Sequence, residues 1–366
     1  MLLTPGPTAV PEFVRTAMSD ITLHHRTPEF ENIFKNTREL LLELFDMPEA
    51  VMLASSGTGA MEACVTNLTH KKALTINSGK FGERFGKICD AHNISYTEIK
   101  HEWNTPASIE EITNAIENDK DIDAIFIQIC ESAGGLRHPV EDIAKAVKKI
   151  DKNISIIADG ITAVGVEKID TINIDALITG SQKALMLPPG LSMIGFSEEA
   201  VAKIESKPYG YYLNLASEIK KQKTNTTAYT AATTLIIGLG SILNRLKEDG
   251  FENLYTKTAL RAKATREAFK AIGLEVYPTK PSNAMTTIYT ENSNEIRKVL
   301  KEKFDLNIAG GQDHLKGKIF RINHMGLVAD YEAVWAVNAV EKAMDELGLR
   351  VFDGAANKVF MEVCFA

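Results

Sequence analysis

The sequence predicts an α/β fold in which a mostly parallel sheet carries helices on both faces. Short apolar segments alternate with helical ones from the N-terminal region to about residue 249, the pattern of a parallel sheet with crossover helices. The chain has 366 residues, more than one ordinary hydrophobic core holds, which favours two domains. We therefore expect an N-terminal arm over residues 1–14, a large domain over residues 15–249 and a smaller C-terminal α+β domain over residues 250–366.

The expected elements of the large domain follow one another along the chain. Strand positions begin around Met52 and continue through the apolar segments 73–77, 124–130, 154–159, 176–179 and 191–196. Helical periodicity lies between strands, most clearly over residues 109–117 and 141–150. In such a fold the functional groups gather at the C-terminal ends of the strands.

The pattern changes after Tyr229. A long helix is expected there, broken near Asp249-Gly250 and resuming to about residue 271. The small domain is expected to contain strands over 275–277, 284–289 and 319–322 and helices over 295–303 and 331–347. The apolar tail, residues 348–366, is expected to pack against the protein, with an added strand as its candidate structure.

Composition and charge limit the class of protein. The sequence is 45% hydrophobic and 24% charged, which is typical of a soluble globular enzyme. A net charge of −7 argues against nucleic-acid binding, which needs a basic face. The chain does not open with a basic segment and a long apolar run, and no transmembrane segment is predicted, so we expect a cytoplasmic protein that does not bind membranes.

The cysteines indicate neither disulfides nor a metal site. Cys64, Cys89, Cys130 and Cys364 show no paired spacing. Three of them lie in apolar segments, which favours buried thiols in a reducing compartment. No group of cysteines and histidines has metal-ligand spacing, so we expect no metal.

Lys183 occupies a position typical of a covalent catalyst. It lies in the segment SQKALML (181–187), after a strand-like apolar segment and before Pro188-Pro189-Gly190. A lysine at a strand end beside small polar residues can be partly desolvated, which lowers its pKa and makes the amine nucleophilic. Such an amine forms an imine with a carbonyl, and the commonest protein-bound carbonyl is pyridoxal phosphate. For this lysine alone an ordinary surface position is the better interpretation, and it is the surrounding motifs that favour the cofactor.

Asp159 is the candidate partner of the cofactor ring. Pyridoxal phosphate needs a carboxylate beside its ring nitrogen to act as an electron sink. Asp159 follows the buried segment ISIIA (154–158), at the point where strands of an open sheet deliver functional groups. A turn or helix-capping aspartate is an equally open interpretation of this residue by itself.

Two further segments fit the phosphate and the ring. The segment SSGTG (55–59) stands between a short strand and a helix, an arrangement in which backbone N–H groups and the helix dipole bind anions. Phe81 follows the next strand between glycines and can lie flat on a ring, although a core phenylalanine is the likelier role if that residue is judged alone.

Arg321 is the candidate substrate-binding residue. It lies in a strand-like segment between apolar neighbours, and burying its charge alone is costly. Its planar fork suits a carboxylate held bidentate. An internal Asp or Glu partner remains the alternative.

These motifs, in this order and spacing, resemble the class V aminotransferases of fold type I, most nearly the alanine–glyoxylate and serine–pyruvate aminotransferase group. The resemblance covers nearly the whole chain and implies the fold of the type I pyridoxal-phosphate-dependent transferases. It is carried by LTPGPT (3–8), HHRTPEF (24–30), SGTGAMEA (56–63), FGER (81–84), Glu131-Ser132, Asp159, GSQKA (180–184), PPG (188–190) and FRI (320–322).

The resemblance implies how the cofactor, pyridoxal 5'-phosphate, is held. Lys183 would form the internal aldimine, a Schiff base, and Asp159 would pair with the pyridine nitrogen. Further residues would bind the phosphate or the ring: Ser56, Gly57, Thr58 and Gln182 at the phosphate, with Phe81 and Ser132 at the ring.

The resemblance also implies a homodimer with shared active sites. Thr227 and Thr230 would complete the phosphate site of the neighbouring subunit, and Arg321 would bind the α-carboxylate of the amino acid. Relatives commonly have proline where this chain has Ala228 and Ala231, and many have glycine where it has Asn323. These departures put the local loop and the shape of the substrate pocket in question.

The function implied is transamination between an amino acid donor of the alanine or serine type and a 2-oxo acid, glyoxylate or pyruvate. One alternative is transamination between 2-aminoethylphosphonate and pyruvate, with Arg321 binding the phosphonate. A lyase or a cysteine desulfurase would use the same scaffold, and Cys364 is the one loop-like candidate for a desulfurase nucleophile. A non-catalytic pyridoxal-binding module lacks support, because no DNA-binding motif is present.

Overall fold

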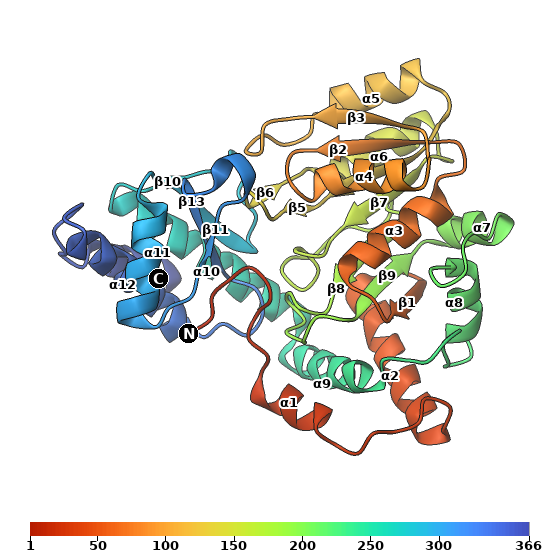
Figure 1. Cartoon of the computed structure of the whole chain (residues 1–366), viewed down its shortest axis with the longest axis horizontal. Coiled ribbons are helices and arrows are strands. Elements are labelled where there is room, and N and C mark those ends of the chain that lie inside the picture. Colours follow the sequence, from red (N-terminus) through yellow and green to blue (C-terminus); the bar gives the residue numbers. More distant parts are fainter. Residues whose placement is uncertain (366) are drawn as a thin grey trace.

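The computed structural model describes residues 1–365, and two β-sheets lie in separate parts of the molecule (Figure 1). The large sheet has seven strands in the order β1-β9-β8-β7-β4-β2-β3. Their bounds are β1 Glu49–Leu53, β2 Lys72–Asn77, β3 Tyr96–Lys100, β4 Ile122–Gln128, β7 Ser155–Asp159, β8 Ala176–Gly180 and β9 Ser192–Phe196.

The predicted mostly parallel sheet is confirmed. Strands β3, β2, β4, β7 and β8 run parallel to one another. Strand β9 is antiparallel to both β8 and β1. Every residue of β1, β7, β8 and β9 is buried, which explains why these segments are continuously apolar rather than alternating.

The strand expected over residues 124–130 is divided, and this part of the prediction is wrong. Strand β4 ends at Gln128, and the chain then leaves the sheet as a hairpin of β5 (Cys130–Glu131) and β6 (Leu136–Arg137). The backbone N–H of Ile129 still donates to the carbonyl of Asp159, at 2.9 Å. The turn therefore projects the residues after Ile129 away from the sheet.

Helices cover both faces of the large sheet, each over its own hydrophobic cluster. One face is covered by α2 (Pro28–Phe45), α5 (Ile109–Asn118), α6 (Val140–Ile150) and α9 (Thr233–Asp249). The other is covered by α3 (Gly57–Leu68), α4 (Gly82–Ala91), α7 (Glu198–Ser206) and α8 (Leu215–Gln222). The three-layer arrangement leaves the strand ends as the place where polar side chains meet.

The C-terminal part has a four-stranded antiparallel sheet with its own hydrophobic cluster. Its strands are β10 (Glu275–Val276), β11 (Met285–Tyr289), β13 (Ile319–Asn323) and β12 (Ala309–Gly310), in that order. The helices of this part are α10 (Phe251–Ala271), α11 (Ser293–Phe304), α12 (Asp330–Glu346) and α13 (Ala355–Cys364), with a 3-10 turn over Asp313–Leu315. Gly250 separates α9 from α10 with φ 82°, at the point where the sequence predicts a break. The domain boundary at this residue stays a prediction.

The tail forms a helix, so the expectation of an added strand is wrong. Ala356 and Phe360 are fully buried and lie four residues apart, so they share one face of α13. That face packs against α10 and α12. Residue 366 lies outside the described residues.

The first ten residues connect the two sheets. The arm passes from the small sheet to the large one, with α1 (Glu12–Met18) after it (Figure 1). Leu3 donates from its N–H to Asn307 and accepts from Asn323 at its carbonyl, both at 2.9 Å. Thr8 then donates from its N–H to the carbonyl of Gln182, at 3.1 Å. No helix in residues 1–365 is long and apolar enough to cross a membrane.

Candidate active site

A cavity of about 270 Å³ lies at the C-terminal ends of the parallel strands. Strands β7 and β8 end at Asp159 and Gly180, and the helices α3 and α4 begin beside them. Eight of the residues predicted from the sequence line this cavity: Ser56, Gly57, Thr58, Phe81, Ser132, Asp159, Gln182 and Lys183. The arm closes one side through Gly6 and Pro7.

Lys183 is held in a turn by the arm and by its own loop. Thr8 Oγ1 donates to the carbonyl of Lys183, at 2.7 Å, and the Lys183 amine donates to the carbonyl of Pro5, at 2.6 Å. The carbonyl of Lys183 also accepts from the N–H of Met186, at 2.9 Å. Burial lowers the pKa of Lys183 to about 8, and the charge of Arg321 adds to the effect. The amine is therefore available as a nucleophile near neutral pH.

Asp159 ends β7 and faces the same cavity. Its carboxylate is almost fully buried and accepts one backbone hydrogen bond, from Ile161 at 2.9 Å. Burial raises the pKa of Asp159 to about 6, opposed by that hydrogen bond and by the charges of Arg84 and Lys183. Most of this carboxylate remains ionised at neutral pH and can hold a proton on a ring nitrogen.

The first turn of α3 presents backbone N–H groups to the cavity. The helix begins at Gly57, three residues earlier than the apolar pattern indicates, with Ser56 as its N-cap residue. The Ser56 side chain makes no capping hydrogen bond. A Cβ atom on Gly57 would lie 2.5 Å from Ile161 Cδ1, so a larger residue there would require the Ile161 side chain to move. Such a helix start binds phosphate well.

Glu131 organises the second wall of the cavity and was not assigned a role from the sequence. It is fully buried, and Oε2 accepts from the N–H groups of Phe81 and Gly82, at 3.0 and 2.9 Å. Oε1 accepts from Ala133, at 2.9 Å. Burial raises the pKa of Glu131 to about 7. One carboxylate thus fixes both the start of α4, which carries Phe81, and the turn that carries Ser132.

Arg321 lies on β13, outside the residues that line the cavity but joined to it. Its guanidinium donates to the carbonyl of Ser132, at 2.6 Å, and twice to the carbonyl of Gly310, at 3.1 and 2.6 Å. The predicted alternative of an internal Asp or Glu partner is wrong for residues 1–365, where no carboxylate pairs with this side chain. Burial lowers the pKa of Arg321 to about 10, so it stays cationic at neutral pH.

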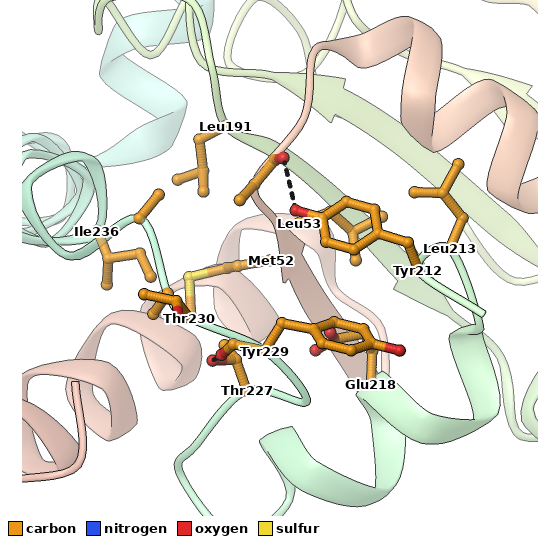
Figure 2. Close-up of a pocket in the computed structure, with 13 residues that line it drawn as sticks. Met52, Leu53, Leu191, Tyr212, Leu213, Glu218, Thr227, Tyr229, Thr230 and Ile236 are labelled. Atoms are coloured by element: carbon orange, nitrogen blue, oxygen red, sulfur yellow. Dashed lines mark hydrogen bonds between the residues drawn. The ribbon is translucent and has the colours of Figure 1, made fainter.

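Thr227 and Thr230 lie apart from the cavity around Lys183. They line a separate, small pocket of about 20 Å³ beside Tyr212 and Tyr229 (Figure 2). Thr227 Oγ1 donates to the carbonyl of Tyr229, at 2.5 Å. Within one chain the structure therefore does not bring the two threonines to the other predicted cofactor residues.

The cysteines are placed largely as predicted. Cys64, Cys89 and Cys130 are buried. Cys364 is the last residue of α13 and packs on the hydrophobic cluster of the small sheet, so the expectation of a loop cysteine is wrong. This position removes the observation that favoured a desulfurase.

The residues around the cavity fit pyridoxal phosphate. Gln182 lines the cavity, and its Oε1 is buried without a hydrogen-bond partner in residues 1–365. The cavity joins a lysine of lowered pKa, a buried carboxylate and a helix N-terminus, the three groups that this cofactor requires. Phe81 adds an aromatic ring to its wall.

Three contributors were not recognised from the sequence. Arg84 lines the cavity three residues after Phe81, Glu131 lies behind it, and Pro5 accepts from Lys183. All three fall in segments that carry the family resemblance. Arg84 lies in the first turn of α4, the helix after β2, as Thr58 lies in the first turn of α3, the helix after β1. Their contacts join segments far apart in the chain, which no local pattern contains.

A half-buried lysine and a buried carboxylate line one cavity at the end of a mostly parallel sheet, the arrangement expected of a fold type I aminotransferase. The chain belongs to the class-V aminotransferase family, because the model of that family (Aminotransferase class-V) matches residues 3–343. It is therefore an aminotransferase, and pyridoxal phosphate is the cofactor that this family implies.

The chain is similar to several curated aminotransferases over almost its whole length. An uncharacterized aminotransferase of Helicobacter pylori (strain ATCC 700392 / 26695) is 48% identical, covering 99% of this chain and 98% of its own. The L-aspartate–glyoxylate aminotransferase of Paracoccus denitrificans is 26% identical and the serine–glyoxylate aminotransferase of Methylorubrum extorquens 28%. These two cover 96% and 97% of this chain and 92% and 93% of their own lengths.

A solved structure has the same fold. The crystal structure of an aspartate aminotransferase of subgroup IV from Thermus thermophilus aligns with a TM-score of 0.86 at 28% identity. The alignment covers 99% of each chain. The predicted fold type is thus confirmed.

Proposed function

We propose that this enzyme transfers the amino group of a small amino acid, of the alanine or serine type, to glyoxylate or pyruvate. The observation that carries the proposal is Arg321, a buried cation bound only to backbone carbonyls in residues 1–365, beside the cavity that contains Lys183. The acceptor is supported by two relatives whose names both include glyoxylate. Their donors differ, which leaves the donor to experiment.

Pyridoxal phosphate would be held at both ends of the cavity. The N–H groups at the start of α3, with Ser56 and Thr58, would bind the phosphate, and Phe81 would lie against the ring. When bound, the cofactor supplies a carbonyl for the amino group and an electron-withdrawing ring. Asp159 would hold the proton on the ring nitrogen, because a buried carboxylate stabilises a nearby cation.

Lys183 moves the proton. Its amine would take the proton from Cα of the amino acid, as general base, and would then deliver it, as general acid, to the carbon that carried the carbonyl of the cofactor. A pKa of about 8 suits both roles, because each protonation state is well populated near neutral pH. The contacts with Pro5 and Thr8 orient the side chain toward the cavity.

Arg321 binds the carboxylate of the substrate. A guanidinium has five N–H donors, and three are engaged with Ser132 and Gly310, so two remain, one on each terminal nitrogen. Those two donors can meet both oxygens of one carboxylate. Because the backbone fixes the guanidinium, little side-chain entropy is lost when the substrate binds.

The proposal includes a homodimer in the cytoplasm. Thr227 and Thr230 would complete the phosphate site of the neighbouring subunit. Their position away from the Lys183 cavity of their own chain supports that arrangement, as does the exposed Tyr211 ring nearby.

The first experiment is a visible spectrum of the purified protein with pyridoxal phosphate, recorded before and after single amino donors. Alanine, serine, aspartate and 2-aminoethylphosphonate are added in turn, without an acceptor. We expect alanine or serine to convert the bound cofactor to its amino form, with one oxo acid released per site. Conversion only by aspartate or by 2-aminoethylphosphonate would overturn the proposed donor, and no cofactor band would overturn the proposal as a whole.

A further inference from the structure

Arg84 joins two walls of the candidate cofactor pocket. It belongs to the first turn of α4 and lines the cavity. Its Nη1 donates to Thr58 Oγ1 at the start of α3, at 2.9 Å. Its guanidinium carbon lies 4.7 Å from the centroid of the Phe81 ring, stacked as in a cation–π pair. One side chain therefore contacts both a proposed phosphate ligand and the proposed stacking residue.

Arg84 contacts two side-chain groups whose orientation the backbone does not fix. A threonine hydroxyl can rotate, and the Phe81 ring is only half-buried, so neither is fixed by its own helix. The planar fork of arginine can donate at its edge while its face lies on an aromatic ring. An ammonium group at this position cannot do both, because it is a compact point charge.

The side chain of Arg84 and the buried carboxylate of Asp159 line the same cavity, and the charge of Arg84 lowers the pKa of Asp159. Other titratable groups around Asp159 are the amine of Lys183, the carboxyl of Glu131 and the thiol of Cys64. Burial raises the pKa of Asp159, and of these neighbours only the two cations, Arg84 and Lys183, lower it. While Lys183 is bonded to the cofactor it would not be a free ammonium group, so Arg84 would be the one of these groups that stays cationic throughout.

We propose that Arg84 is a positioning residue of the cofactor pocket: its guanidinium fixes the Thr58 hydroxyl and the Phe81 ring together and places a positive charge beside Asp159. This inference rests on the proposed function, because it concerns the site of pyridoxal phosphate.

The test is a double-mutant cycle on cofactor affinity rather than on activity. Dissociation constants for pyridoxal phosphate are measured by equilibrium titration of cofactor-free protein for wild type, R84A, T58V and R84A/T58V. We expect each single variant to weaken binding by about tenfold, the effect of losing one hydrogen bond to a charged group. The double variant should bind more tightly than the product of the two single effects predicts, because the Arg84–Thr58 contact is lost in both single variants and can be lost only once.

Two further variants test whether the guanidinium geometry or only the charge of Arg84 matters, and whether any substitution in α4 weakens cofactor binding. R84K should stay within about threefold of R84A, since lysine keeps the charge but cannot pair with Thr58 and Phe81 at once. K87A is the matched control on the same helix, because Lys87 is 60% exposed and points away to Glu83. We expect wild-type affinity for K87A. Thermal unfolding of each variant checks the fold, and T58V tests the same contact from its other side if R84A is unstable.

The outcomes are distinct. The positioning role would be overturned by any one of three results. These are a dissociation constant in the double variant equal to the product of the two single effects, wild-type affinity in R84K, or unchanged affinity in R84A. A wild-type protein that binds no pyridoxal phosphate would instead overturn the proposed function, and this inference with it.

Discussion

Across the described residues, charged side chains are paired at one end of the large sheet and left without an ionic partner at the other. At the C-terminal ends of the strands, Lys183 and Asp159 share a cavity but form no ion pair in residues 1–365. At the opposite end the same residue types are paired completely. Lys203 lies 3.1 Å from Asp123 Oδ2 and Lys148 lies 2.6 Å from Asp175 Oδ2.

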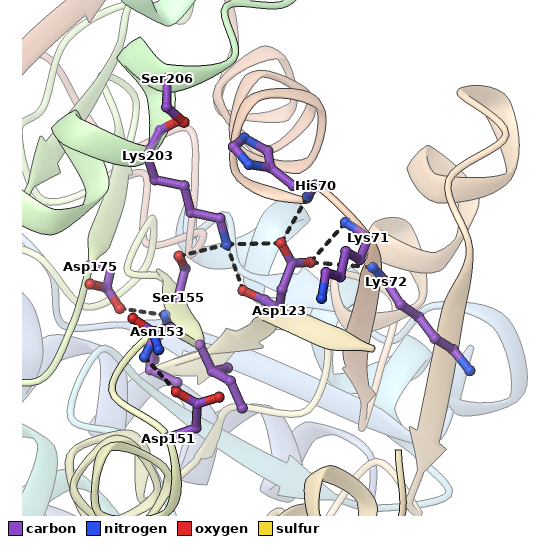
Figure 3. A network of polar contacts seen from close by, with 12 residues as sticks. His70, Lys71, Lys72, Asp123, Asp151, Asn153, Ser155, Asp175, Lys203 and Ser206 are labelled. Carbon is purple, nitrogen blue, oxygen red and sulfur yellow. Dashed lines mark hydrogen bonds and ion pairs between the residues drawn. The ribbon is translucent and has the colours of Figure 1, made fainter. Parts of the chain in front are cut away.

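The charged side chains at the N-terminal ends of the strands bind one another and nearby backbone groups (Figure 3). Asp123 accepts from the N–H groups of His70, Lys71 and Lys72, at 3.0, 3.1 and 3.2 Å. Lys203 also donates to the carbonyl of Asp123, at 2.6 Å. Each charge there has its partners, so the group serves to hold β2, β4 and β7 together.

The difference separates structural charges from reactive ones. A buried charge with a complete set of partners has no free lone pair or donor for a ligand. Lys183 and Asp159 keep theirs, and burial then moves their pKa values toward neutrality, to about 8 and about 6. Incomplete pairing at one sheet end thus supports the proposal that this end carries the chemistry.

The strongest test of this comparison is Lys183→Ala. We expect turnover to fall by more than about 10³-fold, because the variant loses both the nucleophile and the proton carrier. The visible band of bound cofactor should disappear too. Lys168→Ala, at an exposed lysine, serves as the control in a steady-state assay. A coloured and active Lys183→Ala protein would remove this residue from the chemistry.

The pH dependence of cofactor capture tests the lowered pKa of Lys183. Only the neutral amine attacks a carbonyl, so the capture rate should rise about tenfold per pH unit and level off above about 8. An unperturbed lysine would level off near about 10.4. Stopped-flow absorbance of cofactor-free protein mixed with pyridoxal phosphate between pH 6 and 10 measures the midpoint; one near the unperturbed value would contradict the burial argument.

At the opposite sheet end, Asp123→Ala should affect stability and not chemistry. The change leaves Lys203 buried and three backbone N–H groups without their acceptor, so we expect a loss of about 3 kcal/mol in the free energy of unfolding. Asp119→Ala is the control, because its pair with Lys72 is more exposed and worth up to about 1 kcal/mol. Denaturant unfolding and KM are measured together. A large change in KM at intact stability would show that the two ends are not separate in role.

The smallest effect is expected for Gly6→Ala. Gly6 has φ 118°, and a Cβ atom there would lie 2.6 Å from Lys183 Nζ. Strain of about 1–3 kcal/mol should displace the arm from the lysine and slow cofactor capture. Gly210→Ala carries a similar φ penalty, at 79°, with nothing within 4 Å. Comparing capture rates at one pH isolates the contact, and equal rates would mean that the arm does not position Lys183.

Sequence reasoning located six of the seven strands of the large sheet and most of the residues that line the cavity, but missed the edge strands β3 and β12. Asp159 and Lys183, which line one cavity, could be proposed from the sequence because buried parallel strands are short and apolar and polar residues follow at their ends. The tail was misjudged, because its apolar run fits a strand locally, and only the packing of Ala356 and Phe360 on α10 and α12 selects a helix. The division of the strand before Glu131 was missed because residues 124–130 also fit one strand by their local pattern. Only the tertiary structure shows that β4 ends at Gln128.

The sequence by itself determined the class of fold and the family and predicted Lys183 and Asp159 as the reactive pair, because periodicity, strand ends and residue type are local properties. Only the tertiary structure decided which charges remain unpaired. Arg321 lacks a carboxylate in residues 1–365, Arg84 reaches Thr58, and the arm meets Lys183, through contacts between residues 26 to 189 positions apart. Burial and pairing depend on such distant neighbours, and it is these that set the pKa of each group.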